Sequence, residues 1–204
     1  EENLYQRTEQ AQGGWRGERL FYVADKVQES SIITSFYLKP VDGQPVLHHQ
    51  AGQYLGFRFV FPEGEQRRNY SLSAPANGES YRISVKREPG GLVSNYLHDT
   101  VQVGDELRVF PPFGQFTLQH PQRPIVLLSA GVGITPMVPL LEEALRTGQD
   151  VVFVHAAQNH EVDPFYTWLY ELAEQYPQLT LFKCYENNDS GKAHHEGMLN
   201  EALL

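Results

Sequence analysis

The hydrophobic pattern of this chain changes its period once, around the proline-containing residues 120–124. Before that point, short runs rich in β-branched and aromatic residues are separated by glycine and proline, as in antiparallel strands joined by turns. After it, apolar runs of strand length alternate with apolar residues at helical spacing. The first pattern closes most simply into a Greek-key β-barrel, and the second builds a parallel sheet covered by helices. We therefore expect an antiparallel β-barrel over residues 17–122 and an α/β parallel-sheet domain over residues 123–204.

The elements expected in each domain follow from this patterning. Residues 81–86 alternate strictly between apolar and polar, as a half-buried strand requires. The other barrel strands are expected at residues 20–27, 32–38, 54–61 and 107–110, with one short helix between residues 91 and 99. In the second domain we expect strands at residues 125–128, 151–154 and 179–185, and a helix at about residues 136–146.

A second helix of the α/β domain is expected to begin at Asp163 and Pro164, because aspartate is a preferred N-cap and proline suits the first helical position. Only three parallel strands are recognisable before the amphipathic residues 198–204, which we expect to form a helix. The sequence therefore predicts an α/β domain that is truncated.

Composition narrows the class of partner. The formal net charge of −9 argues against nucleic acid. The sequence contains neither an apolar run of about 20 residues nor a basic stretch followed by an apolar one, so neither a membrane span nor a signal peptide is predicted. A single cysteine, Cys184, excludes an intramolecular disulfide and fits a cytoplasmic protein.

The first motif lies in the strand-rich half and consists of Arg68, Asn69, Tyr70 and Ser71. An arginine, an aromatic ring and a hydroxyl so close together suit a flavin nucleotide: charge for the pyrophosphate, a flat face for the ring and a hydroxyl for its nitrogen edge. Tyr54, one strand earlier, offers a second aromatic ring. The alternative is a plain barrel strand with an exposed arginine and a half-buried tyrosine.

One strand later, residues 86–94 carry further features of a phosphate site. Gly90 and Gly91 would let the backbone approach a ligand closely, and Ser94 is expected to cap the short helix and present its first N–H groups. Lys86, Glu88 and Val93 belong to the same candidate site.

The second motif joins the strand at residues 125–128 to the helix that follows it. It consists of Gly131, Val132, Gly133, Ile134, Thr135 and Pro136. Backbone N–H groups at the start of a helix are unpaired and can bind the phosphates of a nucleotide. The alternative is a simple tight turn. Residues 155–159 contain no arginine to meet a 2′-phosphate, which favours NADH over NADPH.

The histidines do not predict a metal site. His48 and His49, like His194 and His195, are adjacent in sequence, so their side chains diverge on most backbones, and we expect them at the surface. Cys184 is expected to be a small core residue.

In combination, Arg-x-Tyr-Ser, Gly-Gly-x-x-Ser and Gly-x-Gly-x-Thr-Pro resemble the ferredoxin–NADP⁺ reductase superfamily. Gly-Gly-Trp at residues 13–15, Gly-Gln-Tyr-Leu-Gly at residues 52–56 and His-Ala-Ala at residues 155–157 are similar to one branch of it, the C-terminal FAD/NAD(P)H reductase part of bacterial flavohaemoglobins. The resemblance covers essentially the whole chain.

The resemblance implies FAD and either NADH or NADPH as cofactors, with Tyr54 and Tyr70 beside the flavin, Arg68 at its pyrophosphate and Ser71 near N5. It implies that residues 1–16 are the remnant of a globin's last helix and a linker, and that haem b lies in the missing globin domain. No catalytic side chain is expected, since the redox chemistry belongs to the cofactors. A monomeric, cytoplasmic nitric oxide dioxygenase would use nitric oxide and oxygen to form nitrate.

Two other functions stay open at this point. The chain could be a stand-alone reductase component that serves a ferredoxin or an oxygenase. It could also be a non-enzymatic module that binds flavin or pyridine nucleotide.

Overall fold

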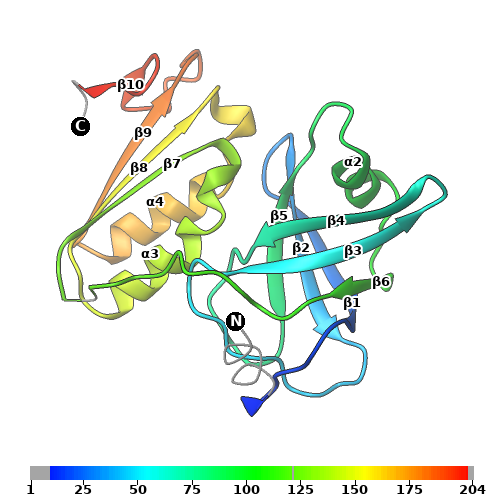
Figure 1. The fold of residues 1–204 in the computed structure, drawn as a ribbon. Coiled ribbons are helices and arrows are strands. Elements are labelled where there is room, and N and C mark those ends of the chain that lie inside the picture. Colours follow the sequence, from blue (N-terminus) through cyan, green and yellow to red (C-terminus); the bar gives the residue numbers. More distant parts are fainter. Residues whose placement is uncertain (1–9, 121, 202–204) are drawn as a thin grey trace.

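The computed structural model describes residues 10–120 and 122–201, which form two sheets of different type. Six strands make an antiparallel sheet: β1 (Arg19–Gln28), β2 (Ile33–Pro40), β3 (Tyr54–Phe61), β4 (Gly64–Ser71), β5 (Tyr81–Lys86) and β6 (Glu106–Val109). Four make a parallel sheet: β7 (Ile125–Ala130), β8 (Val151–Ala157), β9 (Leu179–Tyr185) and β10 (His195–Glu196). The predicted fold class, antiparallel strands followed by a parallel α/β sheet, is confirmed (Figure 1).

The antiparallel strands follow the order β4-β3-β6-β1-β2-β5. A bridge between Leu72, just after β4, and Ile83 on β5 joins the two outer strands, so the sheet curls into a barrel. Alternate residues point inward: on β3, Leu55, Phe57 and Phe59 are buried while their neighbours are more exposed.

One helix, α2 (Leu92–Asp99), is held against the barrel by a buried face and by a lysine. Lys26 Nζ on β1 donates to the carbonyl oxygens of Leu97, His98 and Val101 at 3.2, 2.8 and 2.8 Å. A cation at the carboxyl end of a helix satisfies its unpaired carbonyl groups and complements the helix dipole. This contact fixes the carboxyl end of α2 to β1.

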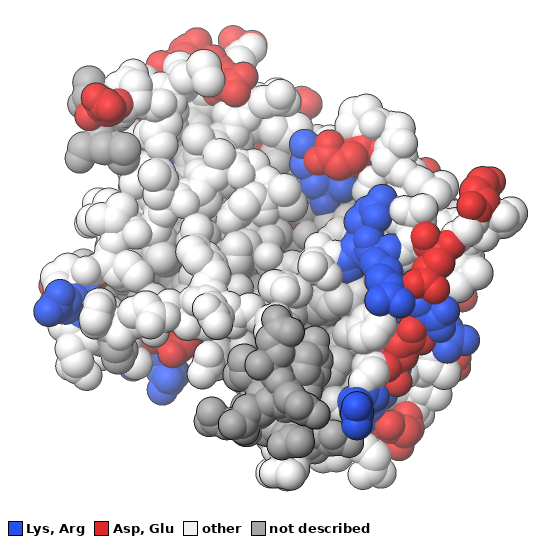
Figure 2. Space-filling model, viewed as in Figure 1, with Lys and Arg blue, Asp and Glu red and all other residues white. Residues whose placement is uncertain are grey.

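The parallel sheet carries both of its helices, α3 (Met137–Arg146) and α4 (Tyr166–Gln175), on the side toward the barrel (Figure 1). Strand order β10-β9-β8-β7 runs in one direction, which places successive right-handed crossovers on one face. On the opposite face, Val126, Leu128 and Val152 are 61%, 43% and 40% exposed. Figure 2 shows the visible side of the α/β domain largely uncharged, whereas Lys, Arg, Asp and Glu alternate over the barrel.

Several expectations about local structure were wrong. Asp163 does not cap α4, which begins at Tyr166 after Phe165 in a left-handed conformation (φ 58°). Its carboxylate is buried and accepts hydrogen bonds from Lys183 and Tyr185 instead. The sheet has a fourth strand, β10, which is too short and polar to produce an alternating pattern.

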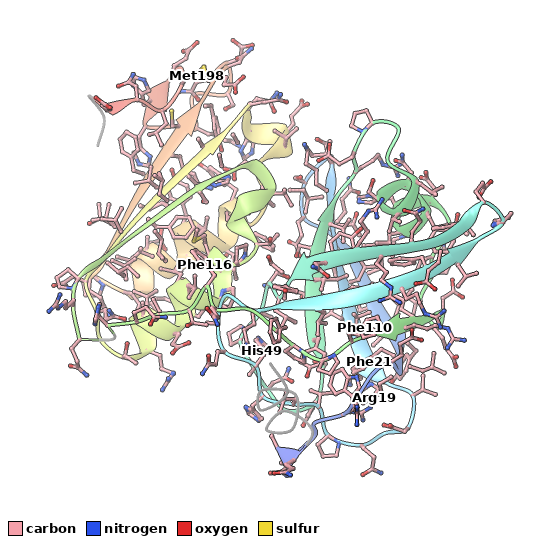
Figure 3. The ribbon with its side chains drawn as sticks, viewed as in Figure 1. Arg19, Phe21, His49, Phe110, Phe116 and Met198 are labelled. Atoms are coloured by element: carbon pink, nitrogen blue, oxygen red, sulfur yellow. The ribbon has the colours of Figure 1, made fainter. Side chains whose placement is uncertain are left out.

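The predictions for the two ends of the chain are only partly tested by the structure. Residues 198–200, expected to be helical, are not, and residues 202–204 lie outside the described residues, as do residues 1–9 of the expected globin remnant. Met198 is exposed at the edge formed by β10 (Figure 3). Cys184 is buried, which confirms the prediction of a core position. None of the described helices is long and apolar enough to cross a membrane.

His49 is buried, so the expectation that it lies at the surface was wrong. His48 and His194 are exposed and His195 is half-buried. The ring of His49 hydrogen-bonds through Nε2 to the carbonyl oxygen of Ala74 at 2.9 Å. Burial lowers the pKa of His49, and burial likewise lowers the pKa of His155, which is 0% exposed.

These two histidines predict how stability depends on pH. A group whose pKa is lower in the folded chain than in the unfolded chain binds its proton preferentially in the unfolded chain, so stability falls as the pH drops through the unfolded value of about 6.5. We expect the free energy of unfolding in urea to fall by up to about 1.4 kcal/mol per pH unit for each such histidine below that pH. His49→Asn should make the slope shallower, because it removes a buried ring that resists protonation in the folded chain. An unchanged slope would contradict the prediction.

Candidate functional site

A hollow of about 460 Å³ lies where the barrel meets the first turn of the α/β domain. Four segments line it: the end of β4, the end of β5, the loop leading into α2, and the turn after β7. That turn, η1 (Gly131–Ile134), packs against β5 (Tyr81–Lys86), so segments about fifty residues apart in sequence share one wall. The lining residues are Arg68, Asn69, Tyr70, Ser71, Ser84, Val85, Lys86, Glu88, Gly91, Leu92, Val93, Ser94, Val132, Gly133, Thr135 and Pro136.

The structure thus brings together both sequence motifs and the stretch between them. All of the predicted site residues line the hollow except Tyr54, Gly131 and Ile134. Tyr54 is the register partner of Ser71 across β3 and β4, but its ring lies against Phe113 at a centroid distance of 6.3 Å. Ile134 is 0% exposed and belongs to the core of the α/β domain. The sequence motifs could not separate core positions from lining positions.

Arg68 supplies uncompensated positive charge at this hollow. Its side chain is exposed, its Nη1 donates to the carbonyl oxygen of Arg67 at 2.7 Å, and no carboxylate of residues 10–120 or 122–201 forms an ion pair with it. The neighbouring Arg67 instead binds Glu65, with Nε and Oε1 2.8 Å apart. A planar guanidinium free of carboxylates is suited to bidentate contact with a phosphate.

Tyr70 provides a half-buried aromatic wall beside that charge. Its ring meets Phe57 edge-on, with centroids 5.6 Å apart and an interplanar angle of 66°. Burial raises the pKa of Tyr70 to about 12, against the opposing charge of Arg68. The phenol therefore stays protonated at neutral pH and presents a flat, neutral surface with a hydroxyl donor.

The amino end of α2 is the second anion-attracting feature. Its N-cap is Gly91, no side chain caps it, and no acidic residue occupies its first turn. The first N–H groups of the helix are thus left without intrahelical partners, at a place where the helix dipole favours an anion. A Cβ at Gly91 would lie 2.6 Å from Ser94 Oγ and 3.2 Å from the carbonyl oxygen of Glu88, so a larger residue would displace groups of this loop.

Ser94 has a different role from the predicted N-cap. It lies inside the first turn, where its Oγ accepts from the backbone N–H of Glu88 at 3.2 Å and donates to the carbonyl oxygen of Gly91 at 3.3 Å. Its hydroxyl therefore shapes the loop before α2. Lys86 and Glu88 form an ion pair across the same loop, with Nζ and Oε1 2.9 Å apart.

The turn η1 contributes backbone of the α/β domain to the lining of the hollow. Gly131 adopts φ 50°, a left-handed value that favours glycine, and Pro136 directly precedes α3 without a side-chain cap. Thr135 Oγ1 donates to the carbonyl oxygen of Val132 at 3.0 Å and closes the turn. A Cβ at Gly133 would meet no atom within 4 Å, so this residue faces open space in the hollow.

Sequence reasoning missed Ser84, Val85 and Leu92 as lining residues. Ser84 Oγ hydrogen-bonds with Ser35 Oγ at 2.7 Å and with Ser73 Oγ at 2.8 Å. Its position could have been found, because residues 82, 84 and 86 share one face of a strictly alternating strand. No group of three potential metal ligands occurs among the residues that the structure describes.

Comparison with known proteins agrees with this arrangement. A family described as the oxidoreductase FAD-binding domain matches residues 21–118, and one described as the oxidoreductase NAD-binding domain matches residues 127–204. The crystal structure of the flavohem-like FAD/NAD-binding domain of nitric oxide dioxygenase from Vibrio cholerae is 36% identical, with a TM-score of 0.85, and the alignment covers 93% of this chain and 83% of that one. The chain belongs to the flavohemoprotein reductase family.

Curated flavohemoproteins extend the similarity over the whole chain. Those of Pseudomonas putida and Pseudomonas aeruginosa are 53% and 52% identical over 205 residues, covering 100% of this chain and 52% of each relative. The chain thus spans about half the length of the curated relatives it matches. Its two halves are an FAD-binding and an NAD-binding oxidoreductase domain.

Gly133→Ala tests whether the turn η1 holds a nucleotide. The methyl group meets no protein atom, so we expect an unchanged thermal midpoint. It would nevertheless occupy the space in which phosphates approach the backbone, so we expect NADH to bind about tenfold more weakly, equivalent to about 1.4 kcal/mol. Titration calorimetry and thermal melting of the same sample measure both quantities; unchanged affinity would place the nucleotide elsewhere.

Proposed function

We propose that this chain transfers hydride from NADH or NADPH to FAD, and that the electrons then pass to the haem of a globin fused to it. The observation that carries this proposal is the shared hollow: an unpaired arginine and an uncapped helix start from the barrel face a glycine turn from the parallel sheet. Two nucleotides bound by these two sets of groups would meet in one place.

The barrel residues fit FAD. Arg68 and the first N–H groups of α2 would hold the pyrophosphate, since both attract anions and neither is neutralised. Tyr70 and, from the neighbouring strand β3, Tyr54 would flank the ring system, and Ser71 would hydrogen-bond near flavin N5. Asn69, Lys86, Glu88 and Val93 complete this side of the hollow.

The turn η1 and Pro136 would hold the phosphates of the nicotinamide nucleotide. The absence of arginine from residues 155–159 favours NADH, and the same stretch contains His155, which is fully buried. FAD supplies the redox chemistry, as an acceptor of hydride and a donor of single electrons. The protein's part is to bring the two reacting atoms to about 3–3.5 Å and to exclude water.

At the level of the whole protein, we propose the activity of a nitric oxide dioxygenase. Residues 17–122 would be the FAD domain, residues 123–204 the nucleotide domain, and residues 1–16 the link to a globin that carries haem b. Oxygen and nitric oxide would be its substrates and nitrate its product, in a monomeric cytoplasmic protein. The similarity to flavohemoproteins of twice this length supports the fusion.

A matched pair of arginine variants tests the flavin site. Arg68→Ala removes a guanidinium that lines the hollow, and we expect FAD to bind at least about tenfold more weakly, since a lost charged hydrogen bond costs about 1.5–3 kcal/mol. Arg67→Ala removes the adjacent arginine, which pairs with Glu65 away from the hollow, and should bind FAD as the unaltered chain does. Equal loss in both variants, measured by flavin fluorescence, would contradict the assignment.

An anaerobic titration of the FAD-reconstituted chain with NADH tests hydride transfer directly. We expect the flavin absorbance to bleach as NADH is added. Bleaching of the chain fused to its globin, followed by a shift of the haem spectrum, would support the complete pathway. A yellow protein that binds NADH and never bleaches would instead support a nucleotide-binding module without reductase activity.

A further inference from the structure

Three polar side chains cross the parallel sheet in one row at its carboxyl end. Ser129 on β7 is the register partner of His155 on β8, which is in turn the register partner of Lys183 on β9. All three lie on the helix-covered face and are 7%, 0% and 0% exposed. Buried polar groups of this kind are costly unless each finds a partner.

Asp163, in the segment between β8 and α4, is the fourth member of the row. Lys183 Nζ donates to both of its carboxylate oxygens, at 2.9 and 2.7 Å, and Tyr185 OH donates to Oδ2 at 2.5 Å. Ser129 Oγ lies 2.8 Å from His155 Nδ1. His155 Nε2 lies 3.2 Å from Asp163 Oδ1, outside hydrogen-bonding geometry, so this contact is electrostatic.

The protonation states follow from these contacts. Burial lowers the pKa of His155, and burial also lowers the pKa of Lys183 although Asp163 opposes that shift. Burial alone would raise the pKa of Asp163, but His155 and Lys183 outweigh it and lower that pKa. Lys183 Nζ contacts both oxygens of Asp163 as an ion pair, and burial favours the neutral form of the adjacent imidazole. With the ring proton on Nε2, which faces the Asp163 carboxylate, Nδ1 accepts the hydroxyl proton of Ser129.

The order serine–histidine–aspartate is that of a hydrolase triad, but this row is not one. In a triad, the carboxylate orients the imidazole and stabilises its charged form. Here Lys183 already neutralises Asp163, and His155 is 0% exposed and out of reach of a substrate. A buried ion pair is also poor evidence of added stability, because desolvation offsets the attraction. The row therefore needs another explanation.

Its location supplies one. Ser129 is followed by Ala130 and then by Gly131, where η1 begins and the chain turns into the hollow. Ser129, through its hydrogen bond to His155, is the last residue of β7 with a side-chain hydrogen bond before that turn. Through His155 and Asp163 it connects the end of β7 to β8, β9 and the start of α4.

We infer that the row Ser129–His155–Asp163–Lys183 is a positioning device that sets the direction in which β7 enters the turn η1, and thereby the affinity of the turn for a nicotinamide nucleotide. The inference rests on the proposed function of that turn. Neither Ser129 nor His155 lines the hollow, so their effect is on the geometry of the residues that do.

Ser129→Ala is the first test, with Gln149→Met as its matched control. Gln149 is 5% exposed, and its Nε2 donates to the carbonyl oxygens of His120 and Arg123 at 3.2 and 2.6 Å, at the opposite end of β7 and β8. Both variants lose buried hydrogen bonds of the same domain. We expect both to melt at lower temperature, but only Ser129→Ala to bind NAD⁺ more weakly, by about tenfold in Kd by calorimetry on the FAD-loaded chain.

A kinetic measurement separates positioning from a general loss of structure. In anaerobic stopped flow with NADH, Ser129→Ala should raise the nucleotide concentration that gives half-maximal flavin reduction and leave the limiting rate unchanged, because only uniform binding is lost. His155→Asn keeps an amide near the position of Nδ1 and should bind nearly as the unaltered chain does. His155→Gln places its amide near Nε2 instead and should weaken binding as Ser129→Ala does.

The outcomes distinguish this inference from the proposed function. Equal Kd values for Ser129→Ala and Gln149→Met, or equal values for the two His155 variants, would overturn the inference. NAD⁺ binding without flavin reduction would overturn hydride transfer. The ratio of the NAD⁺ Kd values of Ser129→Ala and Gln149→Met would still decide the role of the row. An unaltered chain that bound no nucleotide would overturn both.

Discussion

The functional site of this structure depends on backbone N–H groups that helix geometry leaves unpaired. Both α2 and the η1–α3 segment begin without a side-chain cap, and both line one hollow. The remaining architecture keeps these two starts facing each other: Lys26 secures the far end of α2, and η1 packs against β5. Because the chain carries a net negative charge, phosphate binding has to come from such local arrangements and from single unpaired residues such as Arg68.

The two halves reach this common site by different means. The barrel presents side chains on alternate positions of antiparallel strands, so Arg68, Tyr70 and the neighbouring Ser71 arrive together once β4 pairs with β3. The α/β half contributes mainly backbone of the turn η1 to the hollow. The direction of that turn depends on how the strand β7 ends. The buried Asp163–Lys183 pair and His155 place an electrostatic constraint beside that end of β7, next to the apolar core of the same half.

Prediction from the sequence succeeded where local patterns matched the final environment. The alternation of residues 81–86 and the apolar run of residues 179–185 give the strands β5 and β9 with the expected bounds. It failed where a polar residue found a distant partner. Asp163 looked like an N-cap because aspartate normally satisfies helix N–H groups, but Lys183, twenty residues later, took its carboxylate. His49 departed from expectation for the same reason, because its ring bonds to Ala74. Ser94 departed for a local reason: its hydroxyl bonds to Glu88 and Gly91 in the loop before α2.

The sequence by itself determined the two architectures, their order and the motifs that face a nucleotide, because hydrophobic period and glycine placement are local properties. Only the tertiary structure decided that the motifs share one hollow, that Ile134 is core while Gly133 faces open space, and that Ser129, His155 and Lys183 form one row. Those outcomes depend on strand register and on the pairing of buried charges. Both are set by contacts between residues far apart in the chain, which no local pattern encodes.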